Sequence, residues 1–373
     1  MGIRFEFFEA GCGDSILVST DEGTNILIDG GFKYTFSDIL EKYILLQSMG
    51  KKLDLVVLTH NDDDHILGLI ELIKYEKEYL YRDKILEPTI MQVWFNSLDF
   101  DTPNVDDISK SYNSSKNSLI SFSKLMRDKD NRIPFIEHVS VNKEEFQKSI
   151  VINDDIEILL LSPNNGKLDD LLAVKSKIKN RDYSNYLEEI NNNTSNIKQY
   201  YSKDADDGLT YLSNKPFEPD GAEPNGVSIA FILIHENKKY LFLGDAHIPL
   251  IVDELKKYKK YFNNKGKIEF EFIKLSHHGS RKNINQDFLD LIETENFIIL
   301  TNGSKYSHPD KETLSKIICD KTRNTKKSIN FIFNYPKMLN HNKFKCIEMR
   351  EKNFELIYSK KYPLESPLYK ECP

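Results

Sequence analysis

The residues best suited to chemistry stand together in one short run of the chain. The run His60-Asn61-Asp62-Asp63-Asp64-His65 holds two imidazoles and three carboxylates, and so much like charge repels itself unless a cation lies among it. Imidazole and carboxylate are the usual ligands of zinc and manganese. A helix cap at Asp63 or Asp64 would explain one or two acidic residues, but not a histidine at each end. The run therefore predicts a metal site, with Asp63 as the cap.

The flanking residues show how such a site would be positioned. The apolar run Leu53–Thr59 predicts a short buried strand before the acidic run. After it, apolar residues recur at helical spacing, namely Ile66, Leu69, Ile70 and Ile73. Loops at the carboxyl ends of buried strands are where α/β proteins place their sites. We therefore expect an α/β fold with this run at a strand end.

Other predicted strands also end in Asp or His. Asp29 follows Ile26–Ile28, Asp245 follows Tyr240–Gly244, and a strand over Ile268–Leu275 leads into a motif of adjacent histidines. That motif and the further candidates are Ser276-His277-His278-Gly279-Ser280, Asp14 and His308. A lone strand-end Asp is usually a turn residue, but several such ends indicate a site assembled from many loops.

This set of motifs resembles the metallo-β-lactamase fold superfamily, whose pattern is His-x-His-x-Asp-His after a buried strand. The upstream Asp, a later Gly-Asp and a late His complete it, here at Asp29, Asp245 and His277 or His278. Asp62 stands where the second His of the pattern would be. That departure is typical of a branch similar to the hydrolase domain of the competence DNA-uptake protein ComEC. The resemblance implies an αββα sandwich with, in this chain, a long and largely helical insertion.

The resemblance also implies two divalent metal ions, zinc or manganese, that hold a hydroxide for attack on the substrate. One ion would take His60 and Asp62, and the other Asp64, His65 and His277, with Asp245 bridging. Asp62 and Asp64 are also candidate catalytic residues, and His278 and His308 would contact the substrate or protonate the leaving group. Asp14, Asp29 and Ser280 would orient the ligand side chains without contacting the metal ions. The first site lacks a third His, since only His138 and His235 lie in that interval, so it should bind its ion more weakly and favour a harder one.

The motifs divide the chain into two parts. Residues 1–97 and 222–373 carry the motifs and many predicted strands, whereas 98–221 is polar, with helical patches at Ser118–Met126 and Leu168–Ile190. A structureless loop of that length does not fit a compact domain, so we expect an inserted helical subdomain or lid. The tail Phe344–Ile357 predicts a hairpin that turns at Lys352-Asn353.

Three functions remain open at this stage. The first is a nuclease or other phosphodiesterase, with basic stretches near Lys256 and Lys321 as phosphate contacts. The second is a hydrolase of a small ester, lactone or cyclic nucleotide. The third is a protein that binds a partner, or a second copy of itself, through 98–221 as a component of a bacterial multi-protein system, with a vestigial site. The complete set of Asp and His ligands argues against the third.

Composition limits the possible partners and location of the protein. The net charge of −7 gives no global basic field for nucleic acid. No apolar run is long enough for a signal peptide or a membrane span, and the four cysteines are scattered. We therefore expect a cytoplasmic protein without a membrane partner.

Overall fold

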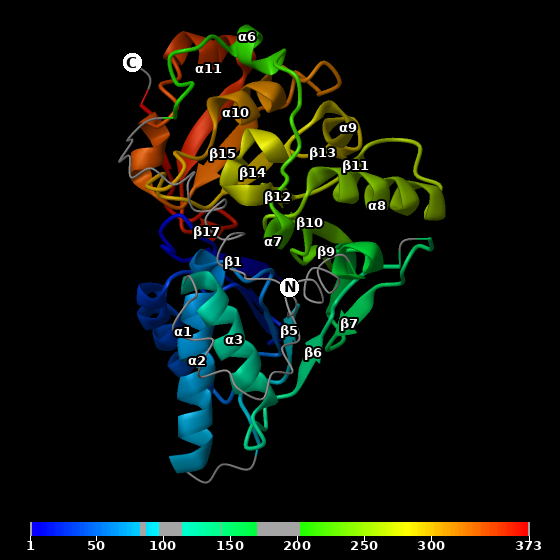
Figure 1. Ribbon diagram of the computed structural model, residues 1–373. Helices are drawn as coiled ribbons and strands as arrows, with labels where there is room; N and C mark the ends of the chain where they lie inside the picture. Colours follow the sequence, from blue (N-terminus) through cyan, green and yellow to red (C-terminus); the bar gives the residue numbers. More distant parts are fainter. Residues whose placement is uncertain (1, 83–86, 97–113, 143, 170–201, 372–373) are drawn as a thin grey trace, which may run out of the picture.

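Two β-sheets lie face to face, and helices cover the outer face of each (Figure 1). The computed structural model describes residues 2–82, 87–96, 114–142, 144–169 and 202–371. The layers run helices, sheet, sheet, helices, which is the αββα sandwich expected from the motifs. The α/β fold class is confirmed.

The first sheet has seven strands and carries the N-terminal helices. Its strands, in spatial order, are β17 (Lys361–Tyr362), β1 (Ile3–Phe7), β2 (Ile16–Thr20), β3 (Asn25–Ile28), β4 (Leu55–Val57), β5 (Val93–Phe95) and β6 (Phe135–Glu137). The helices on its outer face are α1 (Phe36–Ser48), α2 (Asp63–Arg82) and α3 (Ser114–Arg127), with η1 (Lys33–Thr35) before α1. Ile39 of α1, Leu69 of α2 and Phe122 of α3 are buried with Leu27 and Val56 of the sheet, so this layer has its own apolar core.

The second sheet has nine strands and carries the C-terminal helices. Its spatial order is β18 (Leu368–Tyr369), β16 (Phe354–Tyr358), β15 (Ile329–Phe333), β14 (Asn296–Ile299), β12 (Phe272–Lys274), β10 (Lys238–Phe242), β9 (Ala230–His235), β8 (Ile156–Ser162) and β7 (Ile150–Ile152). The associated helices are α6 (Leu209–Ser213), α7 (Glu223–Gly226), α8 (Ile248–Tyr261), α9 (Gln286–Leu289), α10 (Lys311–Ile318) and α11 (Cys346–Lys352). Short 3-10 turns and one small strand pair complete it, namely η2 (Ser276–Gly279), η3 (Arg281–Asn283), η4 (Pro336–Asn340), β11 (Ile268–Glu269) and β13 (Ile292–Glu293).

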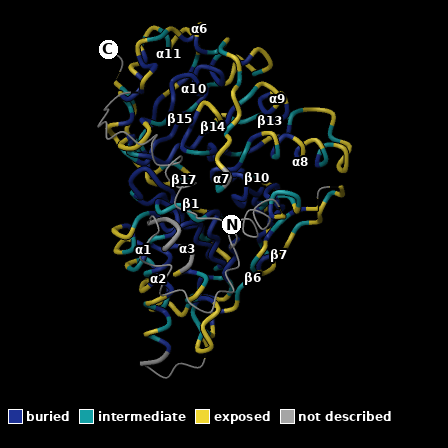
Figure 2. Tube along the Cα trace, viewed as in Figure 1, coloured by how far each residue is buried: buried dark blue, intermediate teal, exposed yellow. Residues whose placement is uncertain are grey.

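The space between the sheets is filled by aromatic side chains. Phe5 of β1 lies edge-on to Phe272 of β12, with ring centroids 4.8 Å apart, and 4.7 Å from Tyr240 of β10. Figure 2 shows the central strands of both sheets as buried, whereas edge strands such as β6 and β7 are partly exposed, like the loops and the outer helix faces. Aromatic side chains bury a large area each, so they stabilise the contact between the two sheets.

Parallel strands meet at one end of the sandwich. Strands β3, β4, β5 and β6 are parallel in the first sheet, as are β10, β12, β14, β15 and β16 in the second. Their carboxyl ends bring the segments that follow β3, β4, β10 and β12 together. These are the segments that carry the predicted Asp and His residues.

The described part of 98–221 differs from the expected helical insertion. Strand β6 extends the first sheet, β7 and β8 extend the second, and α3 packs on α2. Strands β6 and β7 have three residues each and lie at sheet edges, so their patterns are too short to stand out from polar surroundings. Most of the helical patch predicted at Leu168–Ile190 falls at 170–190, outside the described residues.

The tail also differs from its prediction. Residues Cys346–Lys352 form helix α11 rather than the first strand of a hairpin, and β16 then pairs with β15 in parallel. The side chain of Glu348 accepts a hydrogen bond from the backbone N–H of Lys345 (2.8 Å), which stabilises the start of the helix. Asn353, in the left-handed conformation at φ 50°, ends it. The expected reversal at Lys352-Asn353 is thus a helix end.

The helices and the cysteines were also the subject of predictions from composition. None of the helices in the described ranges has the length and apolarity that crossing a bilayer requires. Cys12 and Cys319 are free thiols, whereas Cys346 is disulfide-bonded, which the scattered cysteine pattern did not predict.

Candidate metal centre

The acidic run, which we call the turn, spans the end of the loop after β4 and the first residues of α2. His60 and His65 are buried, and their Nε2 atoms lie 3.7 and 3.8 Å from the carboxylate of Asp245. The carboxylate of Asp62 lies 3.9 Å from the Nε2 of His60, and its side chain is 41% exposed. Asp64 is also buried. The structure therefore brings the predicted residues of this run to one point, with Asp245 between the two histidines.

Two neighbouring loops hold the backbone of this turn. The N–H of Asp14 donates to the carbonyl of Asp64 (3.2 Å), and the N–H of Gly30 donates to the carbonyl of His65 (2.7 Å). A Cβ atom on Gly13 would lie 1.7 Å from the carbonyl oxygen of Asp64, so only glycine fits there. The glycines near the start of the chain thus let the loop approach the first turn of α2.

Asp29, which follows β3, organises both histidines of the turn. Its Oδ1 accepts from the Thr59 N–H (2.7 Å), and its Oδ2 accepts from the Thr59 hydroxyl (2.7 Å) and from Nδ1 of His65 (2.9 Å). Because the Thr59 hydroxyl donates to Asp29, it accepts from Nδ1 of His60 (3.1 Å). Burial would lower the pKa of His65, but the Asp29 carboxylate raises it well above its ordinary value.

Asp245 comes from the second sheet, directly after β10. Gly244 before it has φ 49°, and a Cβ atom there would lie 2.4 Å from Oγ of Ser228. That hydroxyl accepts from the N–H of Asp245 (3.1 Å) and holds the loop in place. Burial would raise the pKa of Asp245, but the four surrounding imidazoles, led by His278, hold it well below its ordinary value.

The adjacent histidines of η2 both place Nε2 near Asp245, but their other contacts differ. Both have left-handed backbone angles, with φ 47° for His277 and 54° for His278, and their ring planes differ by 76°. Nε2 of His278 lies 3.9 Å from Asp64 and 3.7 Å from Asp245. Nδ1 of His278 donates to the carbonyl of Leu300 (2.9 Å), so its Nε2 carries the free lone pair.

His277 has other partners. Its Nδ1 lies 3.2 Å from both Asp220 and Asn225, and its Nε2 lies 3.8 Å from Asp245. Burial would lower the pKa of His277, but the Asp245 and Asp220 carboxylates raise it to about 9. Its ring is 5.3 Å from that of His308 and its side chain is 21% exposed, so this pair lies at the open side of the centre.

The unpartnered atoms of the centre match a metal site. Nε2 of His60, His65 and His278 and Oδ1 of Asp245 are buried and make no hydrogen bond. Buried polar atoms are normally hydrogen-bonded, and here every free atom is a potential metal ligand. Four compact sets in the described centre have ligand atoms within 4.8 Å of one another. Two are His60, His65 and Asp245, and Asp64, His65 and His278, while Asp14 belongs to the other two, with Asp245 and His278 or with Asp29 and His65. The residues present therefore fit divalent metal ions.

Some predicted residues have other contacts, and some participants were not predicted. The Ser280 hydroxyl accepts from the N–H of Lys282 (3.4 Å) and shapes η3, and Nδ1 of His308 lies 3.5 Å from Asp310. Five residues that contact the centre were not predicted as part of it, namely Cys12, Thr59, Asp220, Asn225 and Lys274. The thiol of Cys12 donates to the carboxylate of Asp64 (3.6 Å). Lys274 looked like part of an apolar strand, and Asp220 like part of a polar loop.

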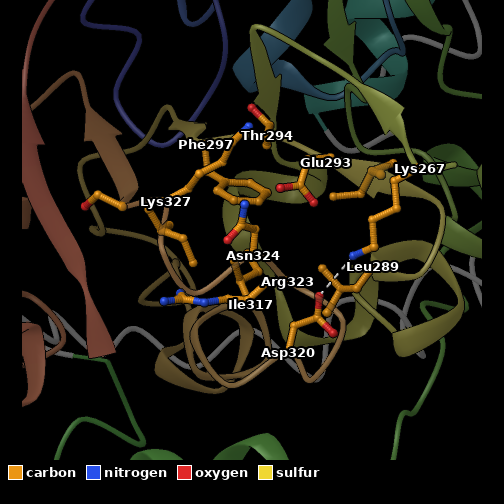
Figure 3. Close-up of a pocket in the computed structure, with 13 residues that line it drawn as sticks. Lys267, Leu289, Glu293, Thr294, Phe297, Ile317, Asp320, Arg323, Asn324 and Lys327 are labelled. Carbon is orange, nitrogen blue, oxygen red and sulfur yellow. Dashed lines mark hydrogen bonds and ion pairs between the residues drawn. The ribbon is translucent and has the colours of Figure 1, made fainter. Parts of the chain in front are cut away.

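Hollows elsewhere do not involve these residues. One of about 30 Å³ lies between β13 and the end of α10, where Lys267 and Asp320 form an ion pair at 3.3 Å (Figure 3). Another, of about 400 Å³, is lined by residues of α11, β16 and β18. No candidate site residue lines either hollow.

Comparison with known proteins relates part of the chain to one superfamily. Residues 11–139 match the family model of the metallo-beta-lactamase superfamily, and no curated protein sequence matches the chain. Similar solved structures include Zn²⁺-bound PqqB from Methylobacterium extorquens (9% identity, TM-score 0.40, 95% of this chain and 98% of that one). A second is the metallo-beta-lactamase fold protein YhfI from Bacillus subtilis (9% identity, TM-score 0.36, 98% of this chain and 99% of that one). A third is a long form RNase Z from yeast (11% identity, TM-score 0.34, 89% of this chain and 36% of that one). Likeness this distant carries no argument about activity.

Proposed function

Because the chain contains a domain of the metallo-beta-lactamase superfamily and has the fold of that superfamily, we propose that it is a metal-dependent hydrolase of phosphodiester bonds. The observation that carries the proposal is the group of three buried imidazoles whose Nε2 atoms have no partner and face Asp64 or Asp245. Each of these imidazoles is fixed through Nδ1 by a hydrogen bond. Such support behind the ligand is a regular feature of metal sites.

Two ligand sets share Asp245 in this proposal. The first consists of His60 and Asp62, and the second of Asp64, His65 and His278. His278 takes the place expected for His277, because it lies within 4.8 Å of both Asp64 and His65. When bound there, divalent ions would lower the pKa of water to about 7 and polarise the scissile bond.

His277 then becomes a substrate-facing residue together with His308. It is held by Asp220 and Asn225 at the open side of the centre, where a substrate can reach its partly exposed ring. Its Nδ1 is occupied by these partners, so Nε2 is the atom available to a substrate oxygen. This exchanges the roles of the two adjacent histidines relative to the sequence-based expectation.

A phosphodiester substrate suits the chemistry of the donor atoms. Asp62 adds an oxygen ligand where the superfamily pattern has an imidazole, and oxygen ligands favour Mn²⁺ or Mg²⁺. Lys305 places a cation near Asp64; burial would lower its pKa, but the Asp64 carboxylate raises it. A cation beside the centre favours an anionic substrate. The carboxylate at Asp62 is also the feature that supports kinship with the ComEC branch.

The direct test is cleavage by the purified protein with Mn²⁺, Mg²⁺ or Zn²⁺. Substrates are plasmid, linear and single-stranded DNA, RNA, and bis-p-nitrophenyl phosphate. We expect hydrolysis that disappears in Asp64→Ala/His65→Ala and persists in Glu76→Gln, which alters a buried carboxylate between α2 and α1. Cleavage of the small diester alone would narrow the substrate to small molecules. A protein that binds no ion and cleaves none of these substrates would contradict the proposal.

A further inference from the structure

A lysine lies behind the centre with almost no access to solvent. Lys274, the last residue of β12, has a side chain that is 1% exposed. Its ammonium donates to the carbonyl of Gly244 (3.1 Å) and forms an ion pair with Asp14. Burying an ammonium is costly unless it is paired and hydrogen-bonded. Lys274 therefore depends on Asp14, and Asp14 on Lys274.

Asp14 connects this lysine to one of the candidate ligands. Its Oδ1 lies 3.3 Å from Nδ1 of His278, whose N–H donates to the carbonyl of Leu300, so the contact between Asp14 and His278 is electrostatic. Nε2 of the same ring faces Asp64 and Asp245. Lys274, Asp14 and His278 thus form a continuous chain from the interior of the second sheet to the centre.

We infer that Lys274 is a positioning residue that controls the affinity of the centre for a metal ion, acting on His278 through Asp14. A carboxylate beside the Nδ1–H of a ligand imidazole orients the ring and makes its Nε2 a stronger donor. Asp14 can take this place only if its own charge is balanced, because Asp64 and Asp245 already crowd the other side of the ring. The Lys274 ammonium supplies that balance through its ion pair with Asp14. The inference rests on the proposed metal centre.

A lysine elsewhere in the chain provides a matched control. Lys316 of α10 is also buried and pairs with Glu312 at 2.7 Å, away from the centre. Lys316→Met removes a buried, ion-paired ammonium as Lys274→Met does. If both lysines serve only to stabilise the fold, the two variants will behave alike.

The experiment measures Co²⁺ and Mn²⁺ binding to Lys274→Met, Asp14→Asn, the double variant and Lys316→Met, with the Co²⁺ absorption spectrum as a second readout. We expect Kd to rise about 10–100-fold in Lys274→Met and in Asp14→Asn, with an altered Co²⁺ spectrum. The double variant should be no weaker than the worse single variant, because the two residues act as one unit. Lys316→Met should melt at a lower temperature and keep the wild-type Kd and spectrum.

Three results would overturn the inference. The first is a wild-type Kd and Co²⁺ spectrum in Lys274→Met. The second is a double variant whose rise in Kd equals the product of the rises in the two single variants. The third is a rise in Kd in Lys316→Met as large as that in Lys274→Met. If Lys274→Met does not fold, Asp14→Asn decides by the same two readouts. Failure of the wild-type protein to bind either ion is a different outcome, since it refutes the metal centre itself.

Discussion

Asp29→Asn tests most directly whether the hydrogen bonds of Asp29 hold the candidate ligands in place. Asp29 is fully buried and accepts three hydrogen bonds, from the N–H and hydroxyl of Thr59 and from Nδ1 of His65. Asparagine has the same shape but only one acceptor oxygen. If that oxygen takes the place of Oδ2, the amide NH₂ group faces the N–H of Thr59, donor against donor.

One unpaired buried donor costs about 1–3 kcal/mol, so Asp29→Asn should lower the unfolding free energy of the metal-free protein by about that amount. Asp29→Ala leaves three donors without an acceptor and should destabilise it further. The Thr59 hydroxyl also fixes His60, so both histidines of the turn lose orientation, and metal affinity should fall about 10–100-fold.

Urea denaturation of the metal-free protein and titration with Mn²⁺ measure the two effects separately. Glu76→Gln is the matched control, because Glu76 is a fully buried carboxylate that accepts from the N–H of Thr89 (2.6 Å) away from the centre. It should lower stability and leave the Mn²⁺ affinity unchanged. Wild-type stability and Mn²⁺ affinity in Asp29→Asn would refute the role assigned to this carboxylate.

Three other substitutions have defined outcomes. Gly13→Ala places a Cβ atom 1.7 Å from the carbonyl oxygen of Asp64, so it should lower the free energy of unfolding by about 1–3 kcal/mol and weaken metal binding. Gly208→Ala is the control, because a Cβ atom there meets no atom within 4 Å, and its melting temperature should not change. Asp62→His has room, since that side chain is 41% exposed, and should shift the ratio of Zn²⁺ to Mn²⁺ affinity toward Zn²⁺ in competition titrations; an unchanged ratio would show that residue 62 is no ligand. Burial would raise the pKa of Asp320, but hydrogen bonds from Thr322 and Gln286 and the charge of Lys267 hold it below the ordinary value of about 3.9. The contribution of Asp320 to stability is therefore present above pH 3.9 and is lost as pH falls through the lower folded-state pKa. Asp320→Asn should destabilise the protein at pH 7 and much less at pH 2. Urea denaturation at both pH values measures this difference.

Sequence patterns predicted the elements whose signals are strong and local. The apolar run before His60 and the helical spacing after His65 correspond to β4 and α2. The strand predicted before Asp245 corresponds to β10, which pairs with β9 through a hairpin turn at Glu236 and Asn237, both with positive φ. Strands β6 and β7 were missed because three-residue edge strands are specified by their neighbours in the sheet rather than by their own composition.

Backbone conformation limits what the sequence can say about the centre. Strand ends that carry Asp or His indicated which segments would meet, because parallel strands bring their carboxyl ends to one edge. The direction of His277 and His278 was not predictable, since it follows from two consecutive left-handed residues in η2. The two ring planes differ by 76°, and Nε2 of both rings lies near Asp245. Nε2 of His278 also approaches Asp64, whereas Nδ1 of His277 lies beside Asp220. One short turn thereby supplies both a candidate ligand and the residue proposed to face the substrate, whereas two adjacent residues in an extended strand would point to opposite faces of the sheet.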